Sequence, residues 1–400
     1  MAKRRKNSWL PLVIGAVGLV VAAAVGFIAY LAATAPPLHP NPQEIQSVTQ
    51  SALPQWTDAI EGGRELVRDS LTYQNLPGIS AAVGVGGEIV WAEGFGWANV
   101  ENSVPVVPDT RFRIGTASTA LTSAAVGLLV EQRRLQLDDE IQKYVPAFPR
   151  KEWPVTLRQL MADVSGVAND AGDEGPLLAQ RCERPLDALP VFAELPLLFK
   201  PGTYVEDSSY GWILVSAAVE AAAGQRILTF MQERIFKPLR MNDTMADSSA
   251  APMAAENKAT SYFPRFASNP DNGVDEMRPL EYSCYSGASV FVSTASDLVR
   301  FGMAISAGTL LQSPTVELLQ TPQRVTSGTE TGFGLGWDLE TVKLAGTPAR
   351  VVVRDGNVLG GQTTTLLILP TRGIVVSVLS NVSHAKTRAM ALRIAEGFAE

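Results

Sequence analysis

The segment ISAAVGVGGEIVWAEGF, residues 79–95, indicates how the fold begins. Two β-favourable runs, Ile79–Val85 and Glu88–Phe95, flank the pair Gly86-Gly87. Two glycines between such runs are typical of a tight hairpin turn, because the turn needs backbone angles that glycine adopts readily. The sequence therefore predicts a pair of neighbouring strands here.

Helical patterns lie on both sides of this hairpin. The segment from Asp58 to Gln74 repeats apolar residues at helical spacing and ends before Pro77-Gly78, which predicts an amphipathic helix closed by a turn. The Ala-rich run from Leu121 to Gln132 is apolar on several sides and predicts a buried helix.

The middle and the end of the chain differ in pattern. Residues 154–279 combine helical segments at Trp212–Ala223 and Leu228–Phe236 with Pro/Gly loops, and show little strand character. Strand patterns then return, and a final helix is expected over residues 386–398. A β-rich start, a helical middle and a β-rich end predict an α+β fold, with one sheet built from both chain ends and a mostly helical insertion. The later strands are expected at Val290–Val292, Gly334–Leu339, Ala349–Val353, Thr363–Leu369 and Ile374–Leu379.

Composition excludes several functional classes. The 400 residues are 46% hydrophobic and 18% charged, which is an ordinary globular balance. The formal net charge is −7, and four of the basic residues lie within the first six positions, so the remainder is more acidic still. This charge argues against a nucleic-acid partner.

Histidine and cysteine are scarce. The only histidines are His39 and His384, and the only cysteines are Cys182 and Cys284. A metal centre built from them would need residues from distant parts of the chain to converge. We therefore expect no metal and no other cofactor. The two cysteines could pair in an oxidising compartment, but their distance and orientation are not defined by the sequence, and free thiols are the expectation.

The N-terminus contains a candidate membrane span. The run from Trp9 to Thr34 is uncharged and exceeds the ~20 apolar residues that cross a bilayer as a helix. Lys3–Lys6 precede it and no further basic residue occurs until Arg64, which places the N-terminus in the cytoplasm and the rest outside. In a bacterium the outside is the periplasmic side of the inner membrane. A cleaved signal peptide is the alternative, but the apolar run is long and Pro36 follows the best cleavage site.

The expected domain plan follows from these segments. Residues 1–8 form a basic cytoplasmic segment and residues 9–34 an uncleaved signal-anchor. Residues 35–50 contain Pro36, Pro37, Pro40 and Pro42, which predict a stiff extended tether. Residues 51–400 form the exported domain.

Six stretches, from about Gly78 onward, resemble the serine β-lactamase-related family. That family shares a fold with penicillin-binding proteins and class C β-lactamases, and the chain is most similar to its membrane-associated, mitochondrial-type branch. The resemblance implies a β-lactamase/transpeptidase-like fold with an antiparallel sheet. The stretches are EIVWAEGFGWANVENSVPVVPDTRFRIG from Glu88, LLVEQRRLQLDDEIQKYVPAFPRKEWPVTLRQLMADVSGV from Leu128, FKPGTY from Phe199, FVSTASDLVRFGMAI from Phe291, GFGLGW from Gly332 and LLILPTRGIVVSVLSN from Leu366.

Activity in this family depends on three motifs, Ser-x-x-Lys, Tyr-x-Asn and His- or Lys-x-Gly. The resemblance places all three in this chain, and every one is substituted. Thr116 stands where the family has its nucleophilic serine, and Thr119 stands where it has the lysine. Asp207 and Ser209 replace the tyrosine and the asparagine of the second motif. The third motif reads Arg354-Asp355-Gly356. The candidate catalytic positions are Thr116, Thr119 and Asp207, and the residues expected to line the cleft are Ser118, Ser209, Arg354, Asp355 and Gly356.

A hydroxyl is a poor nucleophile until a neighbouring group accepts its proton. With lysine and tyrosine both absent, Asp207 is the obvious acceptor, and a carboxylate with a pKa of about 4 is a weak base for a hydroxyl. Losing such coordinated groups costs on the order of 10⁴ to 10⁶ in turnover. We therefore predict a catalytically degenerate member that binds a small molecule, a peptide or a partner. The alternatives are an active esterase, amidase or peptidase that uses Thr116 or Ser118, and a self-associating scaffold at the membrane surface.

Several residues have a purely structural interpretation. Arg354 either pairs with Asp207 or Asp355 or binds an anionic ligand. Thr116 and Ser118 could cap the helix that follows them. The literal Ser383-x-x-Lys386 follows the last expected strand, where Ser383 is expected to cap the terminal helix. Four tryptophans are expected in the core: Trp91, Trp97, Trp212 and Trp337.

Overall fold

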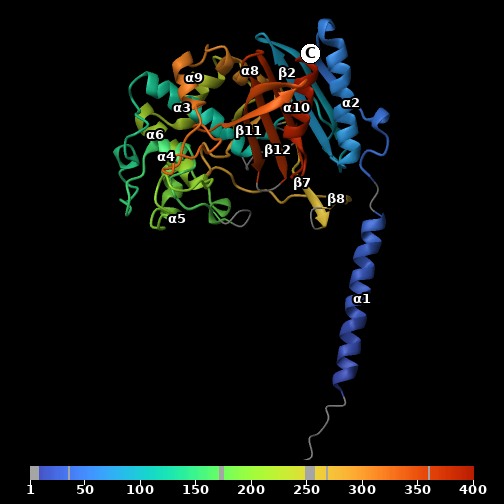
Figure 1. Ribbon diagram of the computed structural model, residues 1–400. Coiled ribbons are helices and arrows are strands. Elements are labelled where there is room, and N and C mark those ends of the chain that lie inside the picture. Colours follow the sequence, from blue (N-terminus) through green and yellow to red (C-terminus); the bar gives the residue numbers. More distant parts are fainter. Residues whose placement is uncertain (1–8, 35–36, 171–174, 248–256, 267–268, 359–360) are drawn as a thin grey trace, which may run out of the picture.

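A computed structural model describes residues 9–34, 37–170, 175–247, 257–266, 269–358 and 361–400. Helix α1 (Leu10–Thr34) extends away from a single large domain that contains the remaining elements (Figure 1). Its segment Leu12–Tyr30 has a mean hydropathy of 2.7 and no buried residue, so its length and composition suit either a membrane span or a signal sequence.

The domain is organised around an antiparallel sheet in the order β1-β3-β2-β13-β12-β11-β10, with β4 paired to β3. Strands β2 and β13 come from opposite ends of the sequence and pair at the centre, where Ala82 lies opposite Ser377. The predicted sheet built from both chain ends is therefore confirmed. Its strands are β1 (Ser47–Ala52), β2 (Gly78–Val85), β3 (Glu88–Asn99), β4 (Val104–Pro105), β10 (Asp338–Leu344), β11 (Thr347–Val358), β12 (Gln362–Leu369) and β13 (Ile374–Ser380).

The hairpin between β2 and β3 forms as its glycines predict. Gly86 and Gly87 have φ angles of +61° and +93°, the left-handed region that side chains with a Cβ avoid. The strand predicted at Gly334–Leu339 begins only at Asp338, because Trp337 is buried in a loop ahead of β10.

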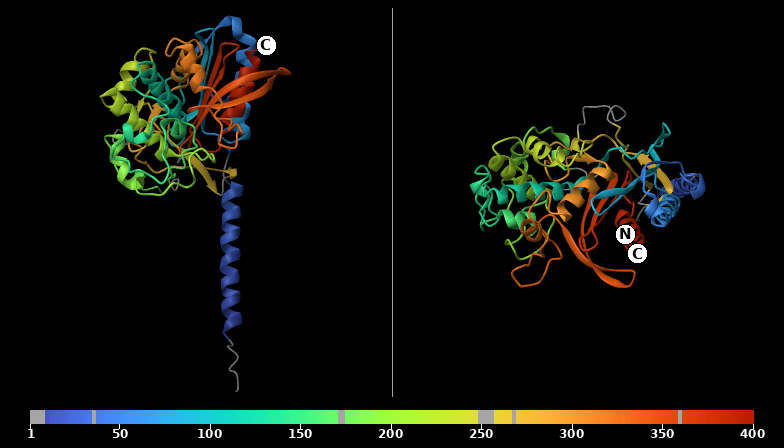
Figure 2. Two further views of the ribbon diagram at one scale, coloured as in Figure 1. Left: turned by 60° about the vertical axis from the view of Figure 1, so that its left-hand side comes forward. Right: turned by 90° about the horizontal axis from the view of Figure 1, so that it is seen from above.

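Helices cover both faces of the sheet (Figure 2). Helices α2 (Thr57–Tyr73) and α10 (Thr387–Gly397) pack on one face, and α8 (Ala295–Ser306) packs on the other. Beyond α8 lies the helical region, which brings α3 and α6 together. Its helices are α3 (Ser118–Glu131), α4 (Leu157–Met161), α5 (Leu189–Phe192), α6 (Ser209–Ala223), α7 (Ile227–Met231) and α9 (Ser313–Leu319).

Each face of the sheet has its own apolar core. Trp91 is fully buried on the α2 and α10 side, and Trp212 and Trp337 are buried on the helical side, as predicted. Trp97 is only half-buried, beside His39, so its predicted place in the core is wrong.

The segment predicted as a tether is part of the domain from Leu38 onward. The Leu38 backbone N–H donates to Asn75 Oδ1 at 2.7 Å, and buried His39 places Nε2 2.9 Å from Pro77 O. Strand β1 then pairs with β3 along the edge of the sheet. The prediction of an extended tether is therefore wrong over the described residues, because Pro42–Glu44 forms a 3₁₀ turn capped by Asn41 and the chain then joins the edge of the sheet.

Three described strands, β6 (Met245–Ala246), β7 (Tyr262–Phe266) and β8 (Asn269–Glu276), lie in the region predicted to be helical. Strands β7 and β8 form a separate hairpin. Their sequences contain prolines and polar residues, which hide the strand pattern. The strand predicted near residue 290 exists as β9 (Phe291–Ser293), but it belongs to a small sheet with β5 (Phe112–Arg113) and β6 (Met245–Ala246).

Cys182 and Cys284 form a disulfide, with their Cα atoms 4.8 Å apart. The expectation of free thiols is therefore wrong. The two cysteines are 102 residues apart in sequence, and only the packing of the helical region against the segment before β9 brings them together.

Candidate functional site

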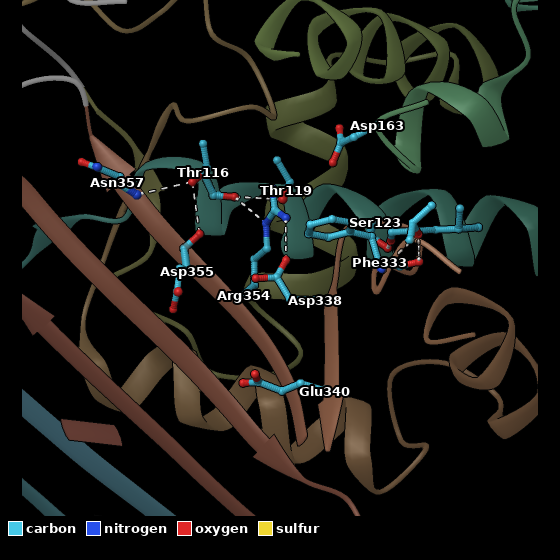
Figure 3. A network of polar contacts seen from close by, with 12 residues as sticks. Thr116, Thr119, Ser123, Asp163, Phe333, Asp338, Glu340, Arg354, Asp355 and Asn357 are labelled. Carbon is cyan, nitrogen blue, oxygen red and sulfur yellow. Dashed lines mark hydrogen bonds and ion pairs between the residues drawn. The ribbon is translucent and has the colours of Figure 1, made fainter. Parts of the chain in front are cut away.

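Thr116 lies in the 3₁₀ turn Gly115–Ala117, directly before α3. Its Oγ1 donates a hydrogen bond to the Asp355 carbonyl at 3.1 Å and accepts one from the Asn357 backbone N–H at 3.3 Å. Both partners belong to β11 (Figure 3). The residues predicted as the first and third motif positions therefore meet, and the Thr116 hydroxyl bonds to the backbone of β11.

Gly356 allows this close approach. A Cβ atom at this position would lie 1.8 Å from the Ile114 carbonyl oxygen and 3.1 Å from the Ala117 side chain. The glycine of the third motif therefore has a steric role, because any side chain would push β11 away from the turn that carries Thr116.

Gly356→Ala is expected to lower the free energy of unfolding by about 3 kcal/mol, the upper part of the usual overpacking range, because the clash is with backbone. Chemical denaturation followed by circular dichroism measures this. Gly62→Ala is the control, since a Cβ there meets no atom within 4 Å and it lies in helix α2. An unchanged midpoint for Gly356→Ala would contradict the close approach of β11.

The other two polar residues of the first motif are buried. Thr119 is 1% exposed, and its Oγ1 donates to the Thr116 carbonyl at 2.8 Å. Ser118 is fully buried, and its Oγ has no hydrogen-bond partner among the described residues. Neither Thr116 nor Ser118 caps α3 through its side chain. Ser118 therefore cannot line an open cleft as predicted.

Arg354 is the centre of the polar contacts here. Its Nη1 forms an ion pair with Asp338 Oδ1 at 3.1 Å, and its Nε donates to the Thr116 carbonyl at 3.3 Å. The side chain is only 8% exposed. The structural interpretation of Arg354 is therefore favoured, but the predicted partners, Asp207 and Asp355, are wrong. The partner is Asp338, the first residue of the neighbouring strand β10.

Asp355 points toward helix α10 instead. Its Oδ2 accepts from Arg388 Nε at 2.6 Å, and its Oδ1 accepts from Thr365 Oγ1 at 2.7 Å. Arg388 also pairs with Asp338 and lies 3.6 Å from Glu340 Oε1. Burial raises the pKa of Asp355, against the opposing effect of Thr365 and Arg388. Two arginines, Arg354 and Arg388, thus face three carboxylates on β10 and β11 and compensate most of their charge.

Asp163 follows α4 and is drawn with the polar residues around Arg354 in the close-up, where the positive charge of Arg354 acts on it (Figure 3). Its backbone has a φ of +56°, and its carboxylate accepts a hydrogen bond from Trp212 Nε1 at 3.2 Å. Burial raises the pKa of Asp163 to about 7, although the positive charge of Arg354 opposes the rise. The sequence analysis missed this residue, as it missed Asp338 and Arg388. No motif includes them, and only the fold brings them together.

The residues predicted as the second motif lie at the start of α6, and among the described contacts no hydrogen bond or ion pair joins them to Thr116. Asp207 is exposed, and within the described part of the chain its side chain makes no hydrogen bond or ion pair. Ser208 caps α6 by accepting from the Gly211 N–H at 3.0 Å. The Ser209 backbone N–H donates to Asn169 Oδ1 at 2.8 Å.

The remaining candidates lie elsewhere. Helix α10 begins at Thr387 without a side-chain cap, so the predicted capping role of Ser383 is wrong. His384 Nε2 lies 2.9 Å from the Gln74 carbonyl, and burial lowers the pKa of this histidine. Over the described ranges, no group of three or more His, Cys, Asp or Glu residues could hold a metal ion.

Known proteins match this fold and its sequence. The Beta-lactamase family matches residues 64–398. The Homo sapiens protein "Serine beta-lactamase-like protein LACTB, mitochondrial" is 26% identical over 442 residues, covering 85% of this chain and 80% of the relative.

Solved structures agree on the fold. The octameric penicillin-binding protein homologue from Pyrococcus abyssi has a TM-score of 0.70 at 21% identity, covering 83% of this chain and 76% of that one. The D-amino acid amidase from Ochrobactrum anthropi SV3 has a TM-score of 0.72 at 21% identity, covering 85% and 98%. These similarities confirm the β-lactamase/transpeptidase-like fold. The family match covers most of the sequence, and the chain is therefore a member of the Beta-lactamase family.

Proposed function

We propose that this chain is a membrane-anchored member of the family that forms no acyl-enzyme and acts by binding a ligand or a partner. The observation that carries the proposal is the bonding of Thr116. Its hydroxyl donates to the backbone carbonyl of Asp355, which is not a base at neutral pH.

Among the described residues, no basic side chain accepts a hydrogen bond from the Thr116 hydroxyl. Thr119 offers only a hydroxyl, which itself donates to the Thr116 carbonyl. Arg354 is a permanent cation that is already paired with Asp338. The described hydrogen bond of the Asp163 carboxylate goes to Trp212, and Asp207 is in solvent. A nucleophile without a base is inactive toward esters and amides.

The location of the domain is part of the proposal. Helix α1 is long and apolar enough to cross a membrane, and basic residues precede it. The disulfide between Cys182 and Cys284 supports export, because such bonds persist in oxidising compartments. We place the N-terminus in the cytoplasm and the domain outside, on the periplasmic side in a bacterium.

Labelling tests the lack of turnover. The purified full chain is incubated with a fluorescent penicillin and with a fluorophosphonate, beside Thr116→Ala and an active serine hydrolase that verifies the reagents. We expect no adduct by intact-mass spectrometry, because the Thr116 hydroxyl donates to a backbone carbonyl and no described side chain is bonded to it as a base. Circular dichroism verifies that the protein is folded.

An adduct on the native chain that is missing from Thr116→Ala would overturn the proposal and favour the active hydrolase. The scaffold alternative, in which copies self-associate at the membrane surface, is separated from both by light scattering on the same samples. A ligand-binding monomer and an assembled scaffold differ there in mass, whatever the labelling result.

A further inference from the structure

We propose that the β7–β8 hairpin lies in the lipid headgroup layer and holds the domain in a fixed orientation on the bilayer, with the Phe263 ring as its membrane contact. The inference rests on the proposed function, because it takes α1 to be a membrane anchor. It goes further in assigning the domain a second contact with lipid.

The hairpin is beside the end of the anchor that faces the domain. Cα atoms of α1 and β8 approach within 8 Å, and both views place the hairpin next to the upper end of α1 (Figures 1 and 2). The apolar segment ends at Tyr30 and the helix at Thr34, about 6 Å further along at 1.5 Å per residue. The headgroup layer is roughly 5–8 Å thick on each side of the hydrocarbon. The hairpin is therefore at headgroup level.

The base of the hairpin is fixed to the domain. Tyr262 is fully buried, its hydroxyl donates to Glu101 Oε2 at 2.5 Å, and that hydroxyl accepts from the Val100 N–H at 2.8 Å. The Tyr262 backbone N–H also donates to the Asn381 carbonyl at 2.9 Å. A contact made by this hairpin would therefore orient the whole domain.

Phe263 projects to the opposite side from Tyr262, as strand alternation requires, and 39% of it is exposed. Aromatic rings favour the boundary between lipid and water. Arg265, the next outward position on β7, forms an ion pair with Asp275 on β8 at 3.0 Å, which lowers the charge carried toward the lipid. An exposed ring beside a neutralised pair suits the interface.

Spin labels on the full chain test the inference in vesicles of phosphatidylcholine and phosphatidylglycerol. The native cysteines are joined, so an introduced cysteine is the free thiol. Labels go on Phe263→Cys, on Val20→Cys in α1, and on Glu88→Cys. Glu88 is the aqueous reference, because it lies at the end of β3 far from the hairpin. The other end of β3 is Asn99, whose side chain bonds Thr260 beside the hairpin. At 3.3 Å per residue, about 36 Å of strand therefore separate Glu88 from the hairpin.

Electron paramagnetic resonance measures how accessible each label is to oxygen, which enters lipid, and to a nickel chelate, which stays in water. We expect the ratio of oxygen to nickel-chelate accessibility to be high at position 20 and several-fold higher at 263 than at 88. In a second set the label is on Arg265→Cys, with Phe263 intact and with Asp275→Asn added so that the loss of Arg265 leaves no unpaired carboxylate. Adding Phe263→Asp should then lower the ratio at 265 several-fold, because a carboxylate leaves the interface.

The outcomes separate the two proposals. A label at position 20 that reads as aqueous would overturn the anchor and the hairpin contact together. The other outcome is a label at position 20 that is exposed to lipid, together with accessibility ratios at 263 and 265 equal to the ratio at 88. That result would overturn the hairpin contact alone.

Discussion

Asp163→Asn is expected to stabilise the protein by up to about 4 kcal/mol at pH 8 and to change its stability little at pH 4. Burial raises the pKa of Asp163 from 3.8 to about 7 in the folded protein. Each pKa unit corresponds to about 1.4 kcal/mol of differential interaction. An asparagine keeps the oxygen that accepts from Trp212 Nε1 and has no charge to bury.

The sign follows from proton linkage. A carboxyl whose folded pKa is raised binds its proton more tightly in the folded state. The native protein therefore keeps full stability from this group below pH 3.8 and loses it as pH rises to about 7. Above that pH the penalty is constant, and the variant, which has no such group, avoids it.

Urea denaturation of both proteins between pH 4 and pH 8 measures this difference, and the comparison cancels the other titrating groups. Asp69→Asn is the matched control, because that carboxylate is exposed in helix α2 and its loss should change stability by less than about 0.5 kcal/mol. A difference between Asp163→Asn and the native protein that does not grow with pH would refute the buried, protonated state of Asp163.

Removal of the disulfide has the other large expected effect. The double variant Cys182→Ala, Cys284→Ala should lose about 4 kcal/mol, because the bond closes a loop of 102 residues in the unfolded chain. Loop-closure entropy for about 100 residues is roughly 4.7 kcal/mol, and native disulfides deliver about 2–5 kcal/mol.

Reducing agent provides the control for this prediction. The native protein in reductant should unfold at the urea concentration of the double variant, and the variant should not respond to reductant. Equal urea midpoints for the oxidised native protein and the double variant would contradict the stabilising role of the bond.

Much of the fold follows from local pattern. Three features were predictable: the β2–β3 hairpin, helix α2 and the pairing of both chain ends in one sheet. They depend on the positions of glycines, the spacing of apolar residues and the order of the strands, all of which are visible in the sequence. The β7–β8 hairpin and strand β1 were not predictable. Their sequences are polar or contain prolines, and they form strands because β7 and β8 pair with each other and β1 finds β3 as its partner.

The site divides in the same way. The resemblance located Thr116, Thr119 and Arg354, and the structure brings these three together. It could not identify Asp338 as the partner of Arg354, because that choice depends on the register between β10 and β11. It also could not show that Ser118 is buried or that Asp207 is left in solvent.

The sequence by itself determined the family, the apolar N-terminal helix and the central sheet, since these depend on residue identity and spacing. Only the tertiary structure decided which charges neutralise one another, that Cys182 and Cys284 join, and that Asp163 is buried beside the motif positions. The physical reason is that ion pairing, disulfide formation and desolvation act through distance in space, and residues far apart along a chain acquire that distance only when it folds.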